Sequence, residues 1–551
     1  MKWLKSFGLF RFLAERDEKS YRSMTLMIVI AGLSSGLLLG VVNHAAAMAA
    51  VGQVSLPVAL LFVVTLPVYI IAKRKALVTA NLSAESAIRD MRIAMSDKIR
   101  RSELMFLEKA GRGEIYARLT QDTTTISQCV PIIFSGYQSA VVIIASLIYM
   151  LVISVQAFVV TVVLLAIGAF VYTINQRQLR DGLQQAIAQE AEFFDSLSHL
   201  IDGFKEIKIN RAKNDEVFRR VEDVSRRTES VMKQVSYGYV DHMVMSQTFF
   251  FLILAVLIFL LPTTDYSQPE IVLKLTAAIL FMVSPLEGAL VAWHYQMKAD
   301  VALGSIERLE RLLDQSEHQE AGAPPPDPSR FAGFSTLRLQ NGVFAYPESE
   351  SNFQVGPLNL EIRRGTSTFV VGGNGCGKST LLKLLTGLYP LQAGRISLDD
   401  EPVTAESIDA YRELYTCIFS DFHLFDRLYG LGERDPDEVR QLIARMGLAD
   451  KVDYRDGRFT NLDLSTGQRK RLALITSFLE DKPIYVFDEW AADQDVEFRA
   501  RFYDEIIPDL TGRGKTVIAV THDDRWYDKC DQLLRLDYGK LSEVRRPGDK
   551  K

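Results

Sequence analysis

The chain contains little cysteine and has no excess of basic charge. Its four cysteines, Cys129, Cys376, Cys417 and Cys530, are scattered over 551 residues, and no two of them form a CxxC pair. The sequence therefore offers no disulfide framework, which favours a reducing compartment for the part of the chain outside a membrane. The formal net charge is −5, so the composition predicts no bulk basic surface for nucleic acid.

Long apolar runs are abundant, and they are concentrated in the first 300 or so residues. A helix needs about 20 apolar residues to cross the roughly 30 Å hydrocarbon core of a membrane. Asp17, Glu18 and the lack of a small-residue cleavage site predict that the first run is an uncleaved helix. Six predicted spans follow one another: Met24–Val42, Leu56–Ala72, Ile132–Ile153, Phe158–Ile174, Met243–Leu261 and Ile271–Trp293.

Lysine and arginine are distributed unequally among the segments between these spans. The N-terminal segment and the two long connections, Lys73–Cys129 and Asn175–His242, are rich in both, whereas the three short connections contain neither. Because cytoplasmic loops carry this excess, both termini are expected in the cytoplasm. Helical periodicity predicts that spans two to five continue as helices and join at turns near Gly111 to Gly113 and near Gly203. Two small extramembrane domains are the alternative.

Glu287 lies inside the sixth predicted span, where a charge costs roughly 2.5–3.5 kcal/mol on insertion scales. It belongs either to a polar cavity that meets a substrate or to a protonated or hydrogen-bonded packing contact, and the sequence leaves both open. His294 and Lys298 lie closer to the cytoplasmic end, and we interpret them as interface anchors rather than ligands.

The pattern changes after the sixth span. The segment Ala321–Pro328 contains four prolines and reads as a linker. From about Phe334, short β-type runs alternate with helical segments. We therefore divide the chain into a transmembrane domain over residues 1–313, a linker over 314–333 and a soluble α/β domain over 334–551.

One glycine-rich segment of the soluble domain matches the pattern GxxxxGK[ST]. It follows the apolar run Ser367–Val371 and precedes the helix-like Thr380–Thr386, as a phosphate-binding loop requires. Lys378 is expected to reach the β- and γ-phosphates of ATP, and the Ser379 hydroxyl to ligate Mg²⁺. The predicted ATP-binding residues of this phosphate loop are Gly372, Gly373, Asn374, Gly375, Cys376, Gly377, Lys378, Ser379 and Thr380.

The apolar run Ile484–Phe487 ends in two carboxylates, Asp488 and Glu489. Asp488 is expected to help to hold Mg²⁺, directly or through water, and Glu489 to polarise the attacking water. By itself this pattern is common, and its alternative reading is a buried strand with a polar end.

The segment Leu464–Gln468, with the sequence LSTGQ, is followed by three basic residues and resembles the ABC signature LSGGQ, with Thr466 in place of the first glycine. The resemblance implies that His522 is the switch histidine at the γ-phosphate, that Tyr346 stacks on adenine and that Asp495 is the D-loop aspartate. It also implies a half-transporter that works as a homodimer, in which the signature of one copy closes over ATP held by the other. The implied signature contacts to nucleotide are Ser465, Thr466, Gly467 and Gln468.

The whole chain resembles ABC exporters of the type IV fold, which implies a six-span α-helical membrane domain plus an α/β P-loop nucleotide-binding domain. The segment Gly111–Asp122 is similar to their first coupling loop. Two positions depart from the family pattern. Ser420 stands where the Q-loop glutamine is expected, after the strand Thr416–Phe419, and Trp490–Ala492 replaces the usual Pro-Thr-Ser.

Three segments, Phe419–Phe425, Leu464–Arg471 and Phe487–Asp495, resemble one subgroup, the cyclic-peptide and siderophore-peptide exporters. This subgroup includes transporters of the pyoverdine precursor and of syringomycin-type lipopeptides. The resemblance implies ATP-driven export of a nonribosomal peptide from cytoplasm to periplasm across a bacterial inner membrane, and it favours the pyoverdine precursor as cargo. A multidrug or lipid exporter is one alternative. A second alternative is an ATP-gated channel or a regulator that transports nothing.

Overall fold

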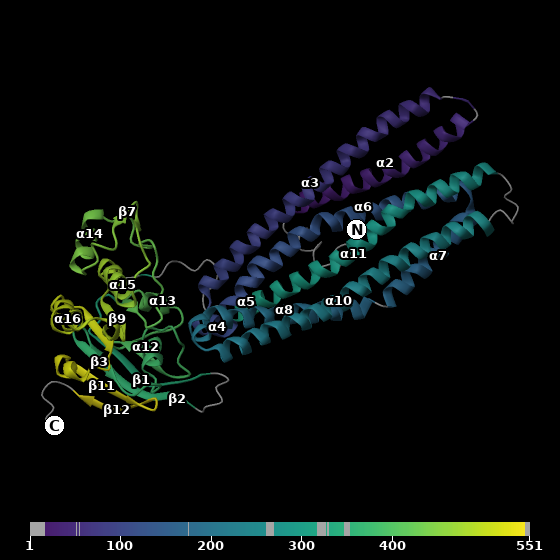
Figure 1. Cartoon of the computed structure of the whole chain (residues 1–551). Helices are drawn as coiled ribbons and strands as arrows, with labels where there is room; N and C mark the ends of the chain where they lie inside the picture. The colour runs from purple at the N-terminus through teal and green to yellow at the C-terminus, as the bar shows by residue number, and fades with distance from the viewer. Residues whose placement is uncertain are drawn as a thin grey trace. The chain divides into compact units, whose positions relative to one another are not determined.

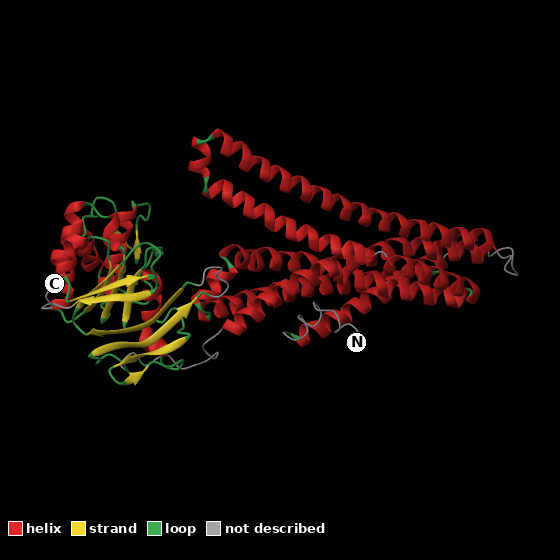
Figure 2. Ribbon diagram, turned by 90° about the horizontal axis from the view of Figure 1, so that it is seen from below, coloured by secondary structure: helices red, strands yellow, loops and turns green. Residues whose placement is uncertain are grey.

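The computed structural model describes residues 17–50, 52–53, 55–174, 176–260, 269–316, 327, 330–346 and 353–545. The chain forms two compact units, one of Met1–Arg100 with Ala110–Gln315 and one of Arg101–Lys109 with Ser316–Lys551. The first unit is helical, and the second contains sheets with helices around them (Figures 1 and 2). Most of the predicted linker, 314–333, lies outside the described residues.

Long helices make up the first unit. They are α2 (Glu18–Ala50), α3 (Leu56–Arg101), α6 (Thr123–Ile153), α7 (Val155–Ile174), α8 (Gln176–Asp202), α10 (Arg211–Ala255) with its continuation η3 (Val256–Leu260), and α11 (Pro269–Ser316). Every predicted span falls on one of them, apart from Leu261, which is not described. Among the described residues, five helices are long and apolar enough to cross a membrane, and a shorter apolar helix covers Val155–Val171.

The two long connections are helical, as predicted, and do not form separate domains. In the first, α3 ends at Arg101, and the short helices α4 (Leu104–Ala110), α5 (Arg112–Ala117) and η2 (Arg118–Asp122) follow. The helix therefore breaks after Arg101 and again at Gly111, which has a φ of 76° and lies at the predicted turn. In the second connection, Gly203 separates α8 from α9 (Phe204–Ile209), as predicted.

Small residues let the helices of the first unit approach one another closely. A Cβ atom on Gly136 of α6 would lie 1.9 Å from the Cβ of Ala292 on α11, and one on Gly36 of α2 would lie 2.4 Å from the Cβ of Ala145 on α6. Close backbone approach of this kind is how helices associate where no hydrophobic driving force exists between them.

The described residues of the second unit form three sheets. Their strands are β1 (Thr336–Ala345), β2 (Gln354–Arg363), β3 (Ser367–Val371), β4 (Ala393–Leu398), β5 (Glu401–Pro402), β6 (Tyr415–Ile418), β7 (Tyr454–Arg455), β8 (Arg458–Phe459), β9 (Ile484–Asp488), β10 (Thr516–Val520), β11 (Gln532–Asp537) and β12 (Lys540–Arg545). The six-stranded sheet has the order β12-β11-β3-β10-β9-β6, and the four-stranded sheet has the order β2-β1-β4-β5. In the larger sheet β11, β3, β10, β9 and β6 are parallel, and only β12 is antiparallel to its neighbour.

The helices of this unit include α12 (Lys378–Leu385), α13 (Ile408–Arg412), α14 (Pro436–Arg445), α15 (Thr466–Glu480), the 3₁₀ helix η5 (Trp490–Asp493), α16 (Val496–Arg501) and α17 (Ile507–Gly512). Successive side chains of a strand point to opposite faces of a sheet. On β9, Tyr485 and Phe487 belong to one hydrophobic core, whereas Ile484 and Val486 belong to another. The buried leucines of α15 lie in the first core and those of α12 in the second. These two helices therefore pack on opposite faces of the six-stranded sheet.

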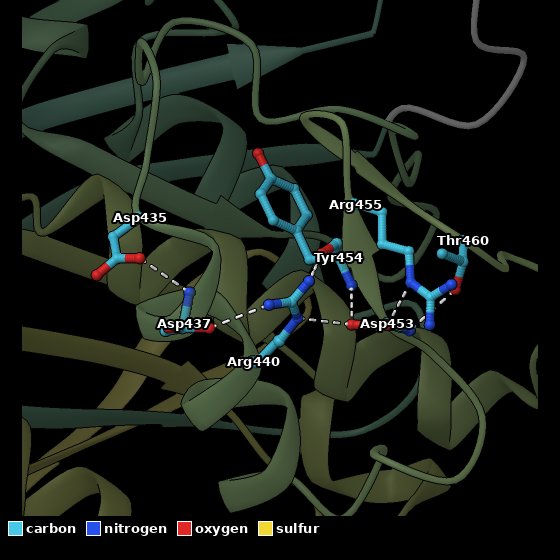
Figure 3. Close-up of polar contacts among 7 residues, drawn as sticks. All are labelled: Asp435, Asp437, Arg440, Asp453, Tyr454, Arg455 and Thr460. Atoms are coloured by element: carbon cyan, nitrogen blue, oxygen red, sulfur yellow. Dashed lines mark hydrogen bonds and ion pairs between the residues drawn. The ribbon is translucent and has the colours of Figure 1, made fainter.

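Polar contacts join α14 to the hairpin of β7 and β8 (Figure 3). Asp435 caps α14 by accepting from the N–H of Asp437 at 3.0 Å. Arg440 donates from Nε to Oδ1 of Asp453 at 2.9 Å, and Arg455 donates to Oδ2 of the same carboxylate at 2.6 Å. These two arginines, Arg455 foremost, hold the pKa of Asp453 at about 2.

Candidate nucleotide site

The phosphate loop joins the end of β3 to the start of α12. Gly372, Gly375 and Gly377 have φ values of 154°, 74° and 103°, which glycine adopts without the steric cost of a side chain. A Cβ atom on Gly372 would lie 2.2 Å from the carbonyl oxygen of Leu536, so no larger residue fits there. The chain thus forms a tight backbone turn that leads into a helix N-terminus, an arrangement that binds phosphate.

The side chains of the loop take different directions. Lys378 is 6% exposed, and its Nζ donates to the carbonyl oxygens of Gly372 at 3.2 Å and Gly373 at 3.0 Å. Its ammonium group is therefore held at the loop, where the sequence predicts the phosphates. Asn374 is exposed, whereas Cys376 is buried in the second core, which leaves only its backbone for a ligand.

Asp488 is a buried carboxylate, 1% exposed, at the end of β9. Burial raises its pKa, and the neighbouring hydroxyls of Ser379 and Ser420 lower it in part. The two hydroxyls lie near the carboxylate, but among the described residues neither oxygen of Asp488 has a hydrogen-bond partner of suitable geometry. A buried charge without partners costs free energy, and a divalent cation between this carboxylate and Ser379 would remove that cost. The residues therefore fit Mg²⁺, which supplies charge neutralisation at the β- and γ-phosphates when bound.

Glu489 and His522 come together although 33 residues separate them. Oε1 of Glu489 lies 2.9 Å from Nε2 of His522, which stands two residues beyond β10. Glu489 has a φ of 51°, a left-handed conformation that is uncommon for a residue with a side chain. The two residues, with Arg499 and Arg525 among others, line a cavity of about 290 Å³. The predicted base thus faces open space while its carboxylate is oriented by the imidazole.

Tyr346 follows β1, next to the start of α12. Its hydroxyl lies 2.8 Å from Oγ1 of Thr380, and its ring packs edge-on against Phe344 and Tyr389 with centroid distances of 5.1 and 5.9 Å. The side chain remains 37% exposed. The ring is therefore fixed beside the phosphate-loop helix and still has surface available for an adenine.

The signature residues form the N-terminus of α15. Ser465 and Gln468 make a capping box, in which the Oγ of Ser465 accepts from the N–H of Gln468 at 3.4 Å and Oε1 of Gln468 accepts from the N–H of Ser465 at 3.2 Å. Ser465 and Thr466 are exposed. A Cβ atom on Gly467 would lie 2.6 Å from the carbonyl oxygen of Asp493, so a close backbone contact requires this glycine. Within the described chain, no hydrogen bond joins this segment to the phosphate loop.

Ser420 and Asp495 complete the set of predicted residues. Ser420 is exposed, follows β6, and lies near the carboxylate of Asp488, whose pKa it lowers. Asp495 caps α16, with Oδ1 accepting from the N–H of Phe498 at 2.8 Å, and its Oδ2 accepts from Arg471 of α15. Ser420 therefore lies at the predicted Mg²⁺ site, whereas Asp495 joins the signature helix to the segment after β9.

Lys470 and Trp490 are absent from the predicted site, although both make polar contacts within it. Nζ of Lys470 donates to the carbonyl oxygen of Glu489 at 2.8 Å, and Nε1 of Trp490 donates to the carbonyl oxygen of Lys470 at 2.9 Å. Two signals in the sequence pointed toward them. Lys470 stands in the basic run after the signature, and Trp490 replaces the family's proline.

Comparison with known proteins matches both units. Residues 355–492 match the family "ABC transporter", and residues 24–284 match the "ABC transporter transmembrane region". The ATP-binding protein SyrD of Pseudomonas syringae pv. syringae is 32% identical over 473 residues, which are 82% of this chain and 81% of that protein. The ATP-dependent lipid A-core flippases of Alkalilimnicola ehrlichii and Xanthomonas euvesicatoria pv. vesicatoria are each 25% identical, over 83% and 84% of this chain and 79% of each flippase. The chain therefore belongs to the ATP-binding cassette transporters, as a multi-pass half-transporter of the exporter type that couples ATP hydrolysis to transport.

Proposed function

We propose that two copies of this chain form a homodimer with two composite ATP sites, which drives the export of a peptide. The main support is the placement of α12 and α15 on opposite faces of one sheet. A phosphate group at the loop before α12 is therefore out of reach of Ser465 and Thr466 in the same chain. Both residues are exposed, so the signature of a second copy can supply the missing contacts.

In the proposed cycle, ATP binds between the phosphate loop of one copy and the signature of the other. Lys378 binds the β- and γ-phosphates, and Asp488 with Ser379 holds Mg²⁺. Glu489 polarises the attacking water, and His522 holds the Glu489 carboxylate in place and reaches toward the γ-phosphate. The proposed membrane is the bacterial inner membrane, with both termini in the cytoplasm, as the Lys and Arg distribution predicts.

The cargo that we propose is a nonribosomal peptide, either a cyclic lipopeptide or a siderophore-peptide precursor such as that of pyoverdine. Two observations support a peptide. The segments Phe419–Phe425 and Phe487–Asp495 resemble the cyclic-peptide exporters. The relative SyrD is also more similar to this chain, at 32% identity, than the flippases at 25%.

A lipid is the second candidate cargo, because relatives that bear the name lipid A-core flippase, among them those of A. ehrlichii and X. euvesicatoria, match at least 83% of this chain. Both cargoes are amphipathic, so a membrane-embedded pathway suits either of them. The two proposals differ in what stimulates ATP hydrolysis.

The test is ATP hydrolysis by the full chain reconstituted in lipid nanodiscs. We expect a purified cyclic lipopeptide or siderophore-peptide precursor to stimulate phosphate release, and lipid A to leave the rate unchanged. Stimulation by lipid A alone would favour a lipid as the cargo.

Proteoliposomes with inside-out protein then test the direction of transport, because a transporter accumulates the peptide in the lumen, whereas a channel or regulator does not. The Glu489→Gln variant is the matched control in both assays.

A further inference from the structure

A cluster of polar contacts ties the signature helix to the segment that follows the catalytic strand β9. We call Lys470, Trp490, Asp493 and Gln494 the clasp. Lys470 donates to the Glu489 carbonyl and Trp490 donates to the Lys470 carbonyl, as described above. In addition, Nζ of Lys470 lies 2.7 Å from Oδ2 of Asp493. Nε2 of Gln494 donates to the carbonyl oxygen of Gly467 at 3.0 Å. Each of these contacts joins α15 to residues 489–494.

Lys470 is the centre of the clasp. Its side chain is 3% exposed, and burying an ammonium group costs free energy unless acceptors replace water. Here a backbone carbonyl at 2.8 Å and a carboxylate at 2.7 Å replace water. Trp490, 1% exposed, covers the contact and stacks on Phe502 with a centroid distance of 4.5 Å. Because the two acceptors lie on one short segment, the ammonium fixes the position of that segment relative to α15.

The segment held by Lys470 begins with the catalytic glutamate. The backbone carbonyl of Glu489 accepts from Lys470, and its carboxylate contacts His522. Its left-handed φ of 51° places the backbone in a conformation that needs support from its surroundings. The orientation of the Glu489 carboxylate therefore depends on a contact made by the signature helix.

The other end of the clasp lies directly under the signature. The carbonyl oxygen of Asp493 would be 2.6 Å from a Cβ atom on Gly467, and Gln494 binds the Gly467 carbonyl while accepting from Nε of Arg471 at 2.8 Å. Backbone in direct contact transmits a displacement instead of absorbing it, because packed interiors leave no free space. A shift of Gly467 therefore moves residues 493 and 494.

We propose that Lys470 is a positioning residue that couples the two ATP sites of the dimer. This rests on the proposed homodimer, in which the signature of a chain meets the ATP of its partner while Glu489 acts on the chain's own ATP. Engagement of Ser465 and Thr466 by nucleotide at one site moves the clasp and orients Glu489 at the other site. Removal of the Lys470 ammonium releases the Glu489 carbonyl from α15, while the contacts of Gly467 with residues 493 and 494 remain, and leaves both sites chemically complete.

The test uses mixed dimers of the full chain, purified in nanodiscs through a different affinity tag on each subunit. One subunit carries Lys378→Ala, which removes ATP from its phosphate loop and so leaves the partner's signature without nucleotide, and the other subunit is unchanged. If the sites are coupled, Glu489 of the unchanged subunit is no longer oriented, so this dimer hydrolyses ATP more slowly than half the parent rate. When both subunits also carry Lys470→Met, we expect the mixed dimer to hydrolyse ATP at about half the rate of the Lys470→Met dimer.

Arg469→Met is the matched control. Arg469 is the exposed neighbour on α15 and lies over the ring of Phe422, so this change should preserve the parent ratio between mixed and unmixed dimers. Asp493→Asn keeps Lys470 in place and weakens one of its contacts, so it should show a partial effect if Lys470→Met fails to fold. The readout is the ratio of the ATP hydrolysis rates of the mixed and unmixed dimers. A general loss of stability lowers both rates and leaves this ratio unchanged.

Two results would overturn the coupling. A parent mixed dimer with half the parent rate means that the sites work independently. A Lys470→Met mixed dimer with the parent's low ratio, together with an unaffected Asp493→Asn, means that the coupling uses another route. A parent chain that is monomeric or does not hydrolyse ATP contradicts the proposed function as well, and this is seen before any variant is made.

Discussion

Nε2 of His522 lies 2.9 Å from Oε1 of Glu489, and this contact joins the ends of two adjacent parallel strands. We expect Glu489→Gln to lower ATP hydrolysis by about 10²- to 10⁴-fold, the usual contribution of a positioned base. ATP binding should persist, because Lys378 and the phosphate loop are unchanged. Phosphate release and the binding of a fluorescent ATP analogue measure the two effects separately.

His522→Ala provides the second half of this prediction. Without the imidazole, the Glu489 carboxylate loses its contact with the residue two positions beyond β10, so hydrolysis should fall while ATP binding is again retained. Asp524→Asn, a change at the start of η7 (Asp524–Lys529), is the nearby control and should leave hydrolysis unaltered. Parent-level hydrolysis by Glu489→Gln would show that another residue acts as the base.

The ring of Tyr346 is fixed by the hydroxyl contact to Thr380 and by Phe344 and Tyr389. We expect Tyr346→Ala to weaken ATP binding by about 1–3 kcal/mol, the value of a base stacked on an aromatic ring. Tyr346→Phe keeps the ring and removes only the hydroxyl contact, so its loss should be smaller. Titration calorimetry with ATP and with inorganic triphosphate gives the answer, because triphosphate has no adenine and should bind both variants alike. Equal losses for both ligands would place the adenine elsewhere.

Glu287 has a partner within the membrane unit, since Nε2 of Gln247 donates to its Oε1 at 2.9 Å. This contact favours the packing role among the two that the sequence leaves open. Glu287→Gln keeps an acceptor for Gln247, so we expect little change in thermal unfolding in detergent. Glu287→Leu leaves the Gln247 amide unpaired and should lower the unfolding temperature, although hydrogen bonds between membrane helices contribute only about 0.6 kcal/mol on average. Loss of peptide-stimulated hydrolysis in Glu287→Gln, with unchanged unfolding, would instead assign the carboxylate to the cargo.

Most of the fold that could be predicted from the sequence was predicted from local patterns of neighbouring residues. The run Ser367–Val371 and the following glycine-rich loop predict the strand, turn and helix of the phosphate site because each step depends on neighbouring residues, and β3 has the predicted bounds. The apolar runs predict the membrane helices for the same reason. The turn at Gly111 was predicted, whereas the earlier break after Arg101 was not, because Ser102 and Glu103 give no glycine or proline signal for it.

Contacts between distant segments could not be predicted in the same way. Lys470 was noted only as one of three basic residues after the signature, yet the structure buries its side chain against residues 19 and 23 positions away. Only the packing of α15 on the sheet brings these groups together. Separate roles for Glu489 and His522 at the γ-phosphate were predicted, but their contact was not, since it follows from the adjacent, in-register pairing of β9 and β10.

Asp453 gives the helical part of the second unit a pH-dependent stability. Hydrogen bonds from Arg455 and Arg440 hold its pKa at about 2, below the ordinary 3.8. Because the folded state has the lower pKa, this stabilisation is complete above the unfolded value of 3.8 and disappears as the pH falls from there toward 2.

Amide hydrogen exchange of α14 and the β7–β8 hairpin in the full chain, measured from pH 5 down to 2.5, should therefore show loss of protection as the pH falls. Asp453→Asn lacks the ionisable group and should show weaker protection at pH 5 with less change across the range. Asp456→Asn, at an exposed left-handed turn position that asparagine tolerates, should behave as the parent does. An unchanged pH dependence in Asp453→Asn would mean that another carboxylate controls the stability of this region.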